Sequence, residues 1–167
     1  FGESPDDVQT VLRVDRVLEG IGTLPGVRAV GVGAAVPPHL ARMQVTLRRR
    51  DEGVDYRAAA VPATPGYLSA LGLQLKEGRF FTGEDSRDAP PVMVMTEATA
   101  KRFFGENAIG KTLRVPRLRD GKMSTVDMTL VGVVRNVRYA GLDSPPDDVI
   151  YVPFQQQPWK SAFLVVR

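Results

Sequence analysis

The sequence of 167 residues contains no cysteine and only one histidine, His39. Without cysteine, the chain cannot form a disulfide framework, a thiolate zinc site or a cysteine nucleophile. With one histidine, it cannot supply the two imidazole ligands of the zinc helix motif. These two absences exclude several common classes of metal site and covalent catalyst.

Long apolar runs and a strong excess of one charge are also missing. No run reaches the roughly 18 residues that a bilayer-spanning helix needs, and the longest, such as residues 130–134, have the length of a strand. The 22 basic and 19 acidic residues give a net charge of +3, which offers no strong argument for nucleic acid as a partner. A hydrophobic content of 43% is that of an ordinary globular chain, which at this length buries a core without cross-links.

Periodicity and turn signals predict a mixed α+β domain. A helix is expected over residues 5–21, because Ser4 and Pro5 form a good helix start and apolar residues then recur at helical spacing. Alternation of apolar and polar residues over 43–48 predicts a strand with one wet face. The other expected elements are helices over 67–71 and 97–104 and strands over 27–35, 55–61, 73–75, 92–95, 112–118, 123–134, 149–152 and 163–166.

Local signals also predict how some of these elements begin and end. Thr96 is expected to cap the helix over 97–104. Residues 51–53 and the dipeptide Asp120-Gly121 are expected to form hairpin turns. The basic run Arg48–Arg50 is interpreted as a guard at the end of an edge strand rather than as a polyanion site.

The segment Gly105–Thr112 matches the phosphate-loop pattern G-x-x-x-x-G-K-[ST] letter for letter. A phosphate loop needs a strand leading in and a helix leading out, because amides and the helix dipole hold the phosphate. Here a helix leads in and a strand containing Pro116 leads out. We therefore interpret the glycines as turn residues, and a nucleotide-binding enzyme that uses Lys111 remains the alternative. Gly31-Val32-Gly33 lacks the third glycine of a dinucleotide fingerprint.

The remaining polar residues do not assemble a recognisable catalytic or metal site. Ser86 lies near two aspartates in sequence, but nothing places His39 beside it and there is no G-x-S-x-G elbow. Two acidic groups miss the spacing of a calcium loop and are expected to be solvated. These groups are Glu84, Asp85 and Asp88, and Asp143, Asp147 and Asp148. We predict no catalytic, cofactor-binding or metal-binding residues, no cofactor, and a function that is not enzymatic.

Prolines and a glycine at residues 62–66 interrupt the regular pattern of the sequence, and we interpret this segment as a boundary between two lobes. Phe1 is not an initiator methionine, and residues 163–167 read as a strand without a terminating turn. We therefore expect the segment to come from a longer polypeptide.

Short sequence motifs follow one another along the chain in a particular order. They are Leu24-Pro25-Gly26-Val27, Thr64-Pro65-Gly66-Tyr67, Leu71-Gly72, Gly78-Arg79-x-Phe81, Asp85, Val92–Met95, Glu97-Ala98, Ala100–Phe104, Ile109-Gly110-Lys111, Val131–Val134, Tyr151-Val152-Pro153 and Leu164–Arg167. No single motif is specific, but their order and spacing together resemble those of the MacB-like periplasmic core domain of FtsX-type ABC transporter permeases. The sequence looks most similar to the acidobacterial type of these permeases.

The resemblance implies a two-lobed domain that projects outside the cytoplasmic membrane, between the first two transmembrane helices of a permease. A porter-like β-α-β lobe would comprise residues 1–62 and 127–167, and a smaller Sabre-like α/β lobe would be inserted at 63–126. The domain would be non-catalytic and would couple ATP hydrolysis by a cytoplasmic subunit or domain to export or mechanotransmission.

The resemblance implies two partners within the transporter, the flanking transmembrane helices and the cytoplasmic ATPase. It also implies a second copy of the domain and a periplasmic partner or substrate. A free-standing periplasmic binding or adaptor module is a third possibility.

Overall fold

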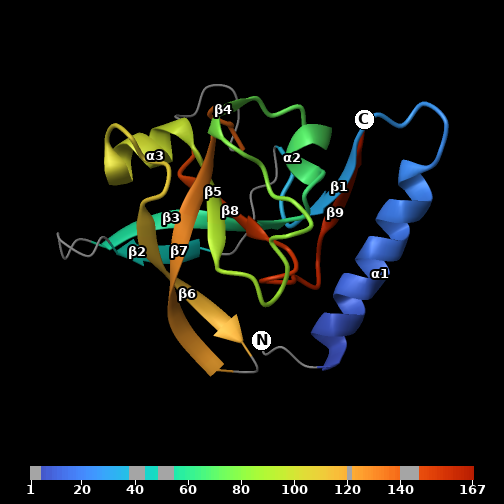
Figure 1. Ribbon diagram of the computed structural model, residues 1–167, viewed down its shortest axis with the longest axis horizontal. Helices are drawn as coiled ribbons and strands as arrows, with labels where there is room; N and C mark the ends of the chain where they lie inside the picture. The colour runs from blue at the N-terminus through green and yellow to red at the C-terminus, as the bar shows by residue number, and fades with distance from the viewer. Residues whose placement is uncertain (1–4, 38–43, 49–54, 120–121, 140–146) are drawn as a thin grey trace.

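The computed structural model describes residues 5–37, 44–48, 55–119, 122–139 and 147–167, which form a mixed sheet flanked by helices (Figure 1). This confirms the predicted mixed class of fold. The elements in chain order are α1 (Pro5–Gly22), β1 (Val30–Gly33), β2 (Gln44–Arg48), β3 (Asp55–Ala63), α2 (Tyr67–Ala70), β4 (Leu75–Gly78), β5 (Val92–Thr96), α3 (Glu97–Phe104), β6 (Thr112–Arg119), β7 (Lys122–Val134), β8 (Val149–Pro153) and β9 (Phe163–Val166).

Six of the strands form a closed ring. Their order is β2-β6-β7-β5-β8-β3, and β2 pairs with β3 as well as with β6. The pairing with β3 covers all of β2, whereas β2 meets β6 at one register pair, Arg48 with Arg114. The prediction that Arg48–Arg50 closes an edge strand is therefore wrong for Arg48, which has a strand on each side, while residues 49–50 lie outside the described residues. β1 and β9 extend the sheet from β3, and β4 pairs with β7.

The interior of the ring is an apolar core to which all six strands contribute. In β2, Val45 and Leu47 are buried while Gln44 and Thr46 are exposed, which confirms the predicted strand with one wet face. Helix α3 adds Phe103 to the same core. The largest contributions from the other strands include Met93, Leu113, Met128, Leu130 and Ile150.

A second core lies on the other face of β3, β5 and β8. It is covered by α2 and by the segments around Phe81 and Tyr139. Tyr139 and Tyr151 join their hydroxyls at 3.0 Å, and burial raises the pKa of both phenols, so they remain neutral hydrogen-bonding groups.

The predicted elements are present, most with bounds within two residues of the prediction, but two are placed differently. The strand expected over 27–35 is regular only over β1, while Arg28 and Ala29 donate their backbone N–H groups to the Arg167 carbonyl. The strand expected over 73–75 is displaced to β4, because pairing with β7 runs from Leu75 to Gly78. The expected turns at residues 51–53 and 120–121 lie outside the described residues.

Helix α3 begins directly after Thr96, as predicted, but the side chain of Thr96 does not cap it. The Thr96 hydroxyl instead lies 2.7 Å from that of Thr99. The N–H of Ala98 donates to Oδ1 of Asn136 at 2.8 Å. The predicted cap is therefore wrong, because an amide from the segment after β7 takes over part of this role.

Helix α2 packs on β1 so closely that two glycines are required. A Cβ atom on Gly31 would lie 2.2 Å from the backbone nitrogen of Tyr67, and one on Gly66 would lie 2.1 Å from the Val30 carbonyl oxygen. The Tyr67 hydroxyl then donates to the Ala35 carbonyl. A Cβ atom on Gly33 would likewise lie 2.4 Å from the Tyr67 ring, so close packing of α2, rather than a bound nucleotide, accounts for both glycines in β1.

The division into lobes at residues 62 and 126 stays a prediction. Strands β5 and β6 of the proposed insertion are hydrogen-bonded within the same sheet as the strands around them. Among the described residues, no helix combines the length and apolar character needed to cross a membrane.

The close approach of α2 to β1 generates a stability test. We expect Gly31→Ala to lower the free energy of unfolding by at least about 2 kcal/mol, because the added methyl group meets backbone atoms that cannot move aside. Gly20→Ala is the matched control: Gly20 lies in α1 with nothing within 4 Å of its Cβ position, and this change should stabilise the helix by up to about 1 kcal/mol. Denaturant titration measures both, and equal effects would contradict this account.

Candidate functional site

The segment that matches the phosphate-loop pattern has the reverse connectivity of a nucleotide site. Helix α3 leads into it, and strand β6 leads out. Gly105 and Gly110 have positive φ angles of 66° and 82°, as expected for turn residues. The N–H of Gly110 donates to the Leu130 carbonyl, so this amide belongs to the sheet. The turn interpretation is confirmed in the structure, because no helix N-terminus follows the loop.

The ammonium group of Lys111 is directed at carbonyl oxygens. Its Nζ donates to the Phe104 carbonyl at 3.0 Å and to the Glu106 carbonyl at 3.1 Å. The Phe104 carbonyl ends α3, where the helix dipole is negative and a cation is favoured, and the Glu106 carbonyl lies in the turn that follows. Lys111 therefore closes the turn that follows α3, and its positive charge is bound by carbonyl oxygens of the protein itself.

A pocket of about 210 Å³ lies between β4, α3 and this turn. Its walls include Lys76, Glu97, Lys101, Gly105 and Glu106. Lys76 and Glu97 form an ion pair with each other, and this pairing lowers the pKa of Glu97. The pocket thus contains charges of both signs that partly neutralise each other.

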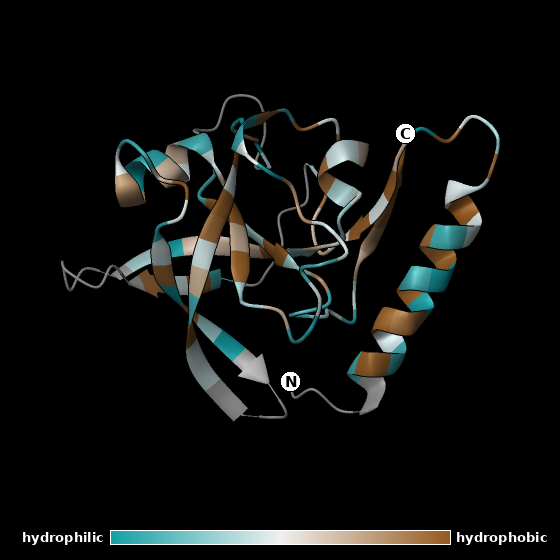
Figure 2. Cartoon of the chain, in the orientation of Figure 1, coloured by the Kyte–Doolittle hydropathy of each residue, from teal (hydrophilic) through white to brown (hydrophobic). Residues whose placement is uncertain are grey.

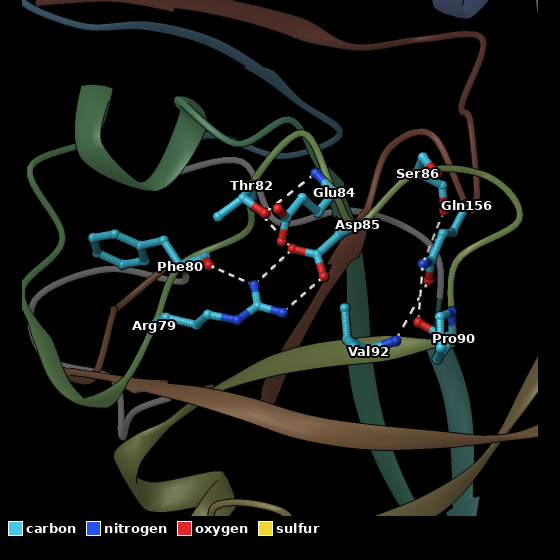
Figure 3. Close-up of polar contacts among 9 residues, drawn as sticks. All are labelled: Arg79, Phe80, Thr82, Glu84, Asp85, Ser86, Pro90, Val92 and Gln156. Carbon is cyan, nitrogen blue, oxygen red and sulfur yellow. Dashed lines mark hydrogen bonds and ion pairs between the residues drawn. The ribbon is translucent and has the colours of Figure 1, made fainter.

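The first acidic group centres on a carboxylate held by an arginine. Arg79 donates to Asp85 through two nitrogens, at 2.7 and 2.9 Å, and the N–H of Thr82 adds a third bond at 2.8 Å (Figure 3). Burial alone would raise the pKa of Asp85, but these hydrogen bonds outweigh it and the pKa lies below its usual value. Asp85 is buried, so the expectation of a solvated loop is wrong for this residue, while Glu84 and Asp88 are exposed as expected.

The side chain of Gln156 fixes the far end of the same loop. Its Nε2 donates to the carbonyls of Ser86 and Pro90, and its Oε1 accepts from the N–H of Val92 (Figure 3). The loop between β4 and β5 is therefore anchored at Asp85 and again at Gln156. Ser86 contributes a backbone carbonyl to this anchor, and His39, the other residue weighed for a triad, lies outside the described residues.

The second acidic group is also committed to internal contacts. Asp147 accepts the N–H of Tyr139 at 2.9 Å. Asp148 forms an ion pair with Arg102 and accepts from the Thr99 hydroxyl. Asp143 lies outside the described residues. Within the part of the chain that the structure describes, no cluster of three or more histidine, cysteine, aspartate or glutamate side chains is arranged to hold a metal ion.

The two anchoring residues differ in how far the sequence could have revealed them. Arg79 and Asp85 both belong to the motifs that carry the family resemblance, so the sequence singled out both residues. Gln156 lies 66 residues from Pro90 and carried no signal, because only the fold brings its amide to that loop.

Comparison with known proteins was consistent at the levels of family, sequence and fold. A family model described as the MacB-like periplasmic core domain matches residues 3–167. The macrolide export ATP-binding/permease protein MacB of Rhodospirillum rubrum is 28% identical over 122 residues, which is 72% of this chain and 17% of that protein. The chain therefore spans less than a fifth of the length of this curated relative.

Two solved structures share the fold. The periplasmic region of MacB from Actinobacillus actinomycetemcomitans gives a TM-score of 0.62 at 17% identity, with 92% of this chain and 63% of that chain covered. The extracellular domain of the noncanonic ABC-type transporter YknZ from Gram-positive bacteria gives 0.58 at 19% identity, with 92% and 72% covered.

The pairing of Arg79 with Asp85 generates a pH-dependent prediction. We expect Asp85→Asn to lower the free energy of unfolding by about 1–2 kcal/mol at pH 7, since Arg79 is 46% exposed and solvent weakens the ion pair. Because the pKa of Asp85 is lowered by folding, the carboxylate stabilises the protein above about pH 4, and this contribution is lost as the pH falls through the folded pKa.

Chemical denaturation of the wild type and of Asp85→Asn from pH 7 down to pH 2 measures the difference between their free energies of unfolding. Glu84→Gln is the control, because this exposed neighbour should change stability by less than about 0.5 kcal/mol. A difference between wild type and Asp85→Asn that stays constant down to pH 2 would contradict the role given to Arg79.

The geometry of Lys111 generates a binding prediction. Titration calorimetry with Mg-ATP at millimolar concentration should give no saturable heat. Lys111→Ala should lower the free energy of unfolding by about 0.5–1 kcal/mol, because two carbonyls at the end of α3 lose their donor. Lys101→Ala on the exposed side of α3 serves as the control. Saturable binding that disappears in Lys111→Ala would favour the nucleotide-binding alternative.

Proposed function

We propose a function from one premise: the chain belongs to the family of MacB-like periplasmic core domains, whose model matches residues 3–167. The matched solved proteins are described as periplasmic or extracellular parts of transporters. We infer that this domain likewise lies outside the cytoplasmic membrane, as part of an ABC transporter permease. ATP would be hydrolysed by a separate cytoplasmic subunit or domain of the same transporter.

We further infer that the domain acts by contact and movement rather than by catalysis. In the described residues, the groups that could have served chemistry have internal partners: Lys111 binds carbonyls, Asp85 binds Arg79, and Asp148 binds Arg102. A catalytic site instead needs such groups to converge on a space where a substrate can sit. This commitment of polar groups supports a non-enzymatic role.

The closed ring of strands supports a role in transmitting movement. A sheet that is hydrogen-bonded around a filled apolar core deforms little, because interiors are close-packed and have low compressibility. Displacement applied at one side of such a body is carried to the other. In this proposal the domain passes the movement generated by ATP hydrolysis to a periplasmic partner or substrate, and the proposed lobes 1–62 with 127–167 and 63–126 are the parts that make these contacts.

The match of residues 3–167 to the family model carries the proposal, and its location can be tested in the parent permease. Leu75 is exposed on β4, and these 167 residues contain no cysteine, so a Leu75→Cys variant offers a single thiol once any cysteine elsewhere in the parent permease is replaced. We expect a membrane-impermeant maleimide to label this thiol in intact cells, with no gain after permeabilisation. Labelling that requires permeabilisation would contradict an extracytoplasmic location.

Coupling can be tested with the same variant in the reconstituted transporter. Streptavidin bound to the biotinylated thiol of the Leu75→Cys variant loads the domain with a bulky protein, and we expect ATP hydrolysis to slow at least two-fold if the two processes are coupled. The biotinylated variant without streptavidin is the control. An unchanged rate of hydrolysis under load would count against transmission of movement.

A further inference from the structure

Strand β4 has an open edge beside the pocket that it forms with α3. Among the described strands, β4 pairs only with β7, so the backbone groups on its other side have no strand partner there. All four of its residues are exposed. Figure 1 shows β4 and α3 at the same end of the molecule, and Figure 2 shows hydrophilic residues on both. The edge is therefore accessible to an extended chain.

An irregular pairing brings two consecutive residues of β4 to the pocket. Successive side chains of a strand normally point to opposite faces. The register of β4 on β7 shifts between Leu75 and Glu77, however, and both Lys76 and Glu77 line the pocket. A chain that paired with β4 would therefore run past the pocket, with one of its side chains in reach of it.

The pocket has the size and the lining of a receptor for one side chain. Its volume of about 210 Å³ is below the roughly 300–1,000 Å³ of pockets that enclose a whole small-molecule ligand. The buried part of its lining is apolar and consists of Ala100, Ala108 and Val133, while the charged residues of the lining are more exposed. Such a lining suits a long side chain with an apolar stem and a charged end.

The cations around the pocket are gathered at Glu97. Lys76 donates to its carboxylate, and this bond, together with the charges of Lys76, Arg135 and Lys101, lowers the pKa of Glu97. A lysine on an edge strand ordinarily discourages pairing, because its charge stays at the edge. Here the charge of Lys76 is directed to α3 instead, so it does not guard β4.

Two carboxylates of the pocket have no such cation. Glu77 lies on β4 and Glu106 lies in the turn after α3, and both are exposed. Among the described side chains, neither forms an ion pair. A guanidinium or ammonium group that entered the pocket would bring a positive charge to both carboxylates. The charges therefore favour a basic side chain over an acidic one.

We propose that the open edge of β4 and the adjoining pocket are a docking site for an extended segment of a periplasmic partner protein, which adds a strand to β4 and places a lysine or arginine side chain in the pocket. This inference rests on the proposed function, because such a partner meets the domain only outside the cytoplasmic membrane. In strand addition, main-chain hydrogen bonds supply affinity and side-chain pockets supply specificity. Both features lie side by side at β4.

Peptide binding to the purified parent permease tests the proposal. The probe is the fluorescein-labelled peptide Thr-Val-Arg-Val-Thr, whose β-branched residues favour an extended chain. We expect fluorescence anisotropy to show saturable binding below about 1 mM peptide, and about five-fold weaker binding when glutamine or glutamate replaces the arginine. Absence of saturable binding, or equal binding of the three peptides, would overturn the proposal.

Charge-neutralising variants of the permease locate the binding site. Glu77→Gln and Glu106→Gln should each weaken binding of the arginine peptide about three-fold and leave binding of the glutamine peptide unchanged. Glu84→Gln is the matched control, because it removes an exposed carboxylate that does not line the pocket. A loss of binding in the control as large as in the two pocket variants would contradict docking at β4.

Methylation of the peptide's backbone amides tests strand addition. Alternate residues of an added strand direct their N–H groups to the edge that they join, while the residues between them face away. N-methylation of one alternate set should therefore abolish binding, and N-methylation of the other set should preserve it. Equal losses with both sets, or competition by free arginine as strong as by the unlabelled peptide, would overturn the proposal in favour of a site for a small basic molecule.

Failure of this inference is distinguishable from failure of the proposed function. The purified permease presents β4 to the peptide whichever side of the membrane the domain occupies. A negative binding result therefore counts against the docking site alone, whereas labelling of the Leu75→Cys variant in intact cells decides the extracytoplasmic location.

Discussion

Closure of the sheet through β2 is the constraint on which the other features of this structure depend. Because β2 is hydrogen-bonded to β3 along its length and to β6 at Arg48, the six strands enclose an interior of fixed size. That interior must be filled from every strand, and α3 completes it with Phe103. Closure also removes free edges from the ring. Among the described strands, only β4 and β9 are left with a single neighbour.

A closed core fixes where the connecting segments can run, and polar contacts then hold them there. Gly132 of β7 lies so close to the Arg79 carbonyl that a Cβ atom would come within 2.1 Å of it. This contact sets the path of the chain just before Arg79 reaches Asp85. Gln156 ties the end of the same loop to β5. The loop is thus positioned by backbone packing at one end and by a buried amide at the other.

Much of the local structure could be predicted from the sequence, because it depends on neighbouring residues. The apolar run of β5, the alternation in β2 and the helical spacing in α1 each report the environment of a single element. Closure of the ring could not be predicted in this way, since the pairing of Arg48 with Arg114 joins residues far apart in the chain. The contacts of Gln156 and the cap that Asn136 provides for α3 also join residues far apart in the chain. Arg79 and Asp85, in contrast, are six residues apart, and both belong to the motifs that carry the family resemblance.

The segment Gly105–Thr112 shows why a residue pattern alone does not define a site. In a phosphate loop, the lysine and the backbone amides point toward an anion at the start of a helix. Here the same lysine follows the end of a helix and meets two carbonyls, which are partial negative charges supplied by the protein itself. A phosphate would have to displace these acceptors without gaining a helix dipole in return. Lys111, Asp85 and Asp148 are therefore bound to partners within the protein, while the apolar residues Leu12 of α1 and Leu164 of β9 are exposed.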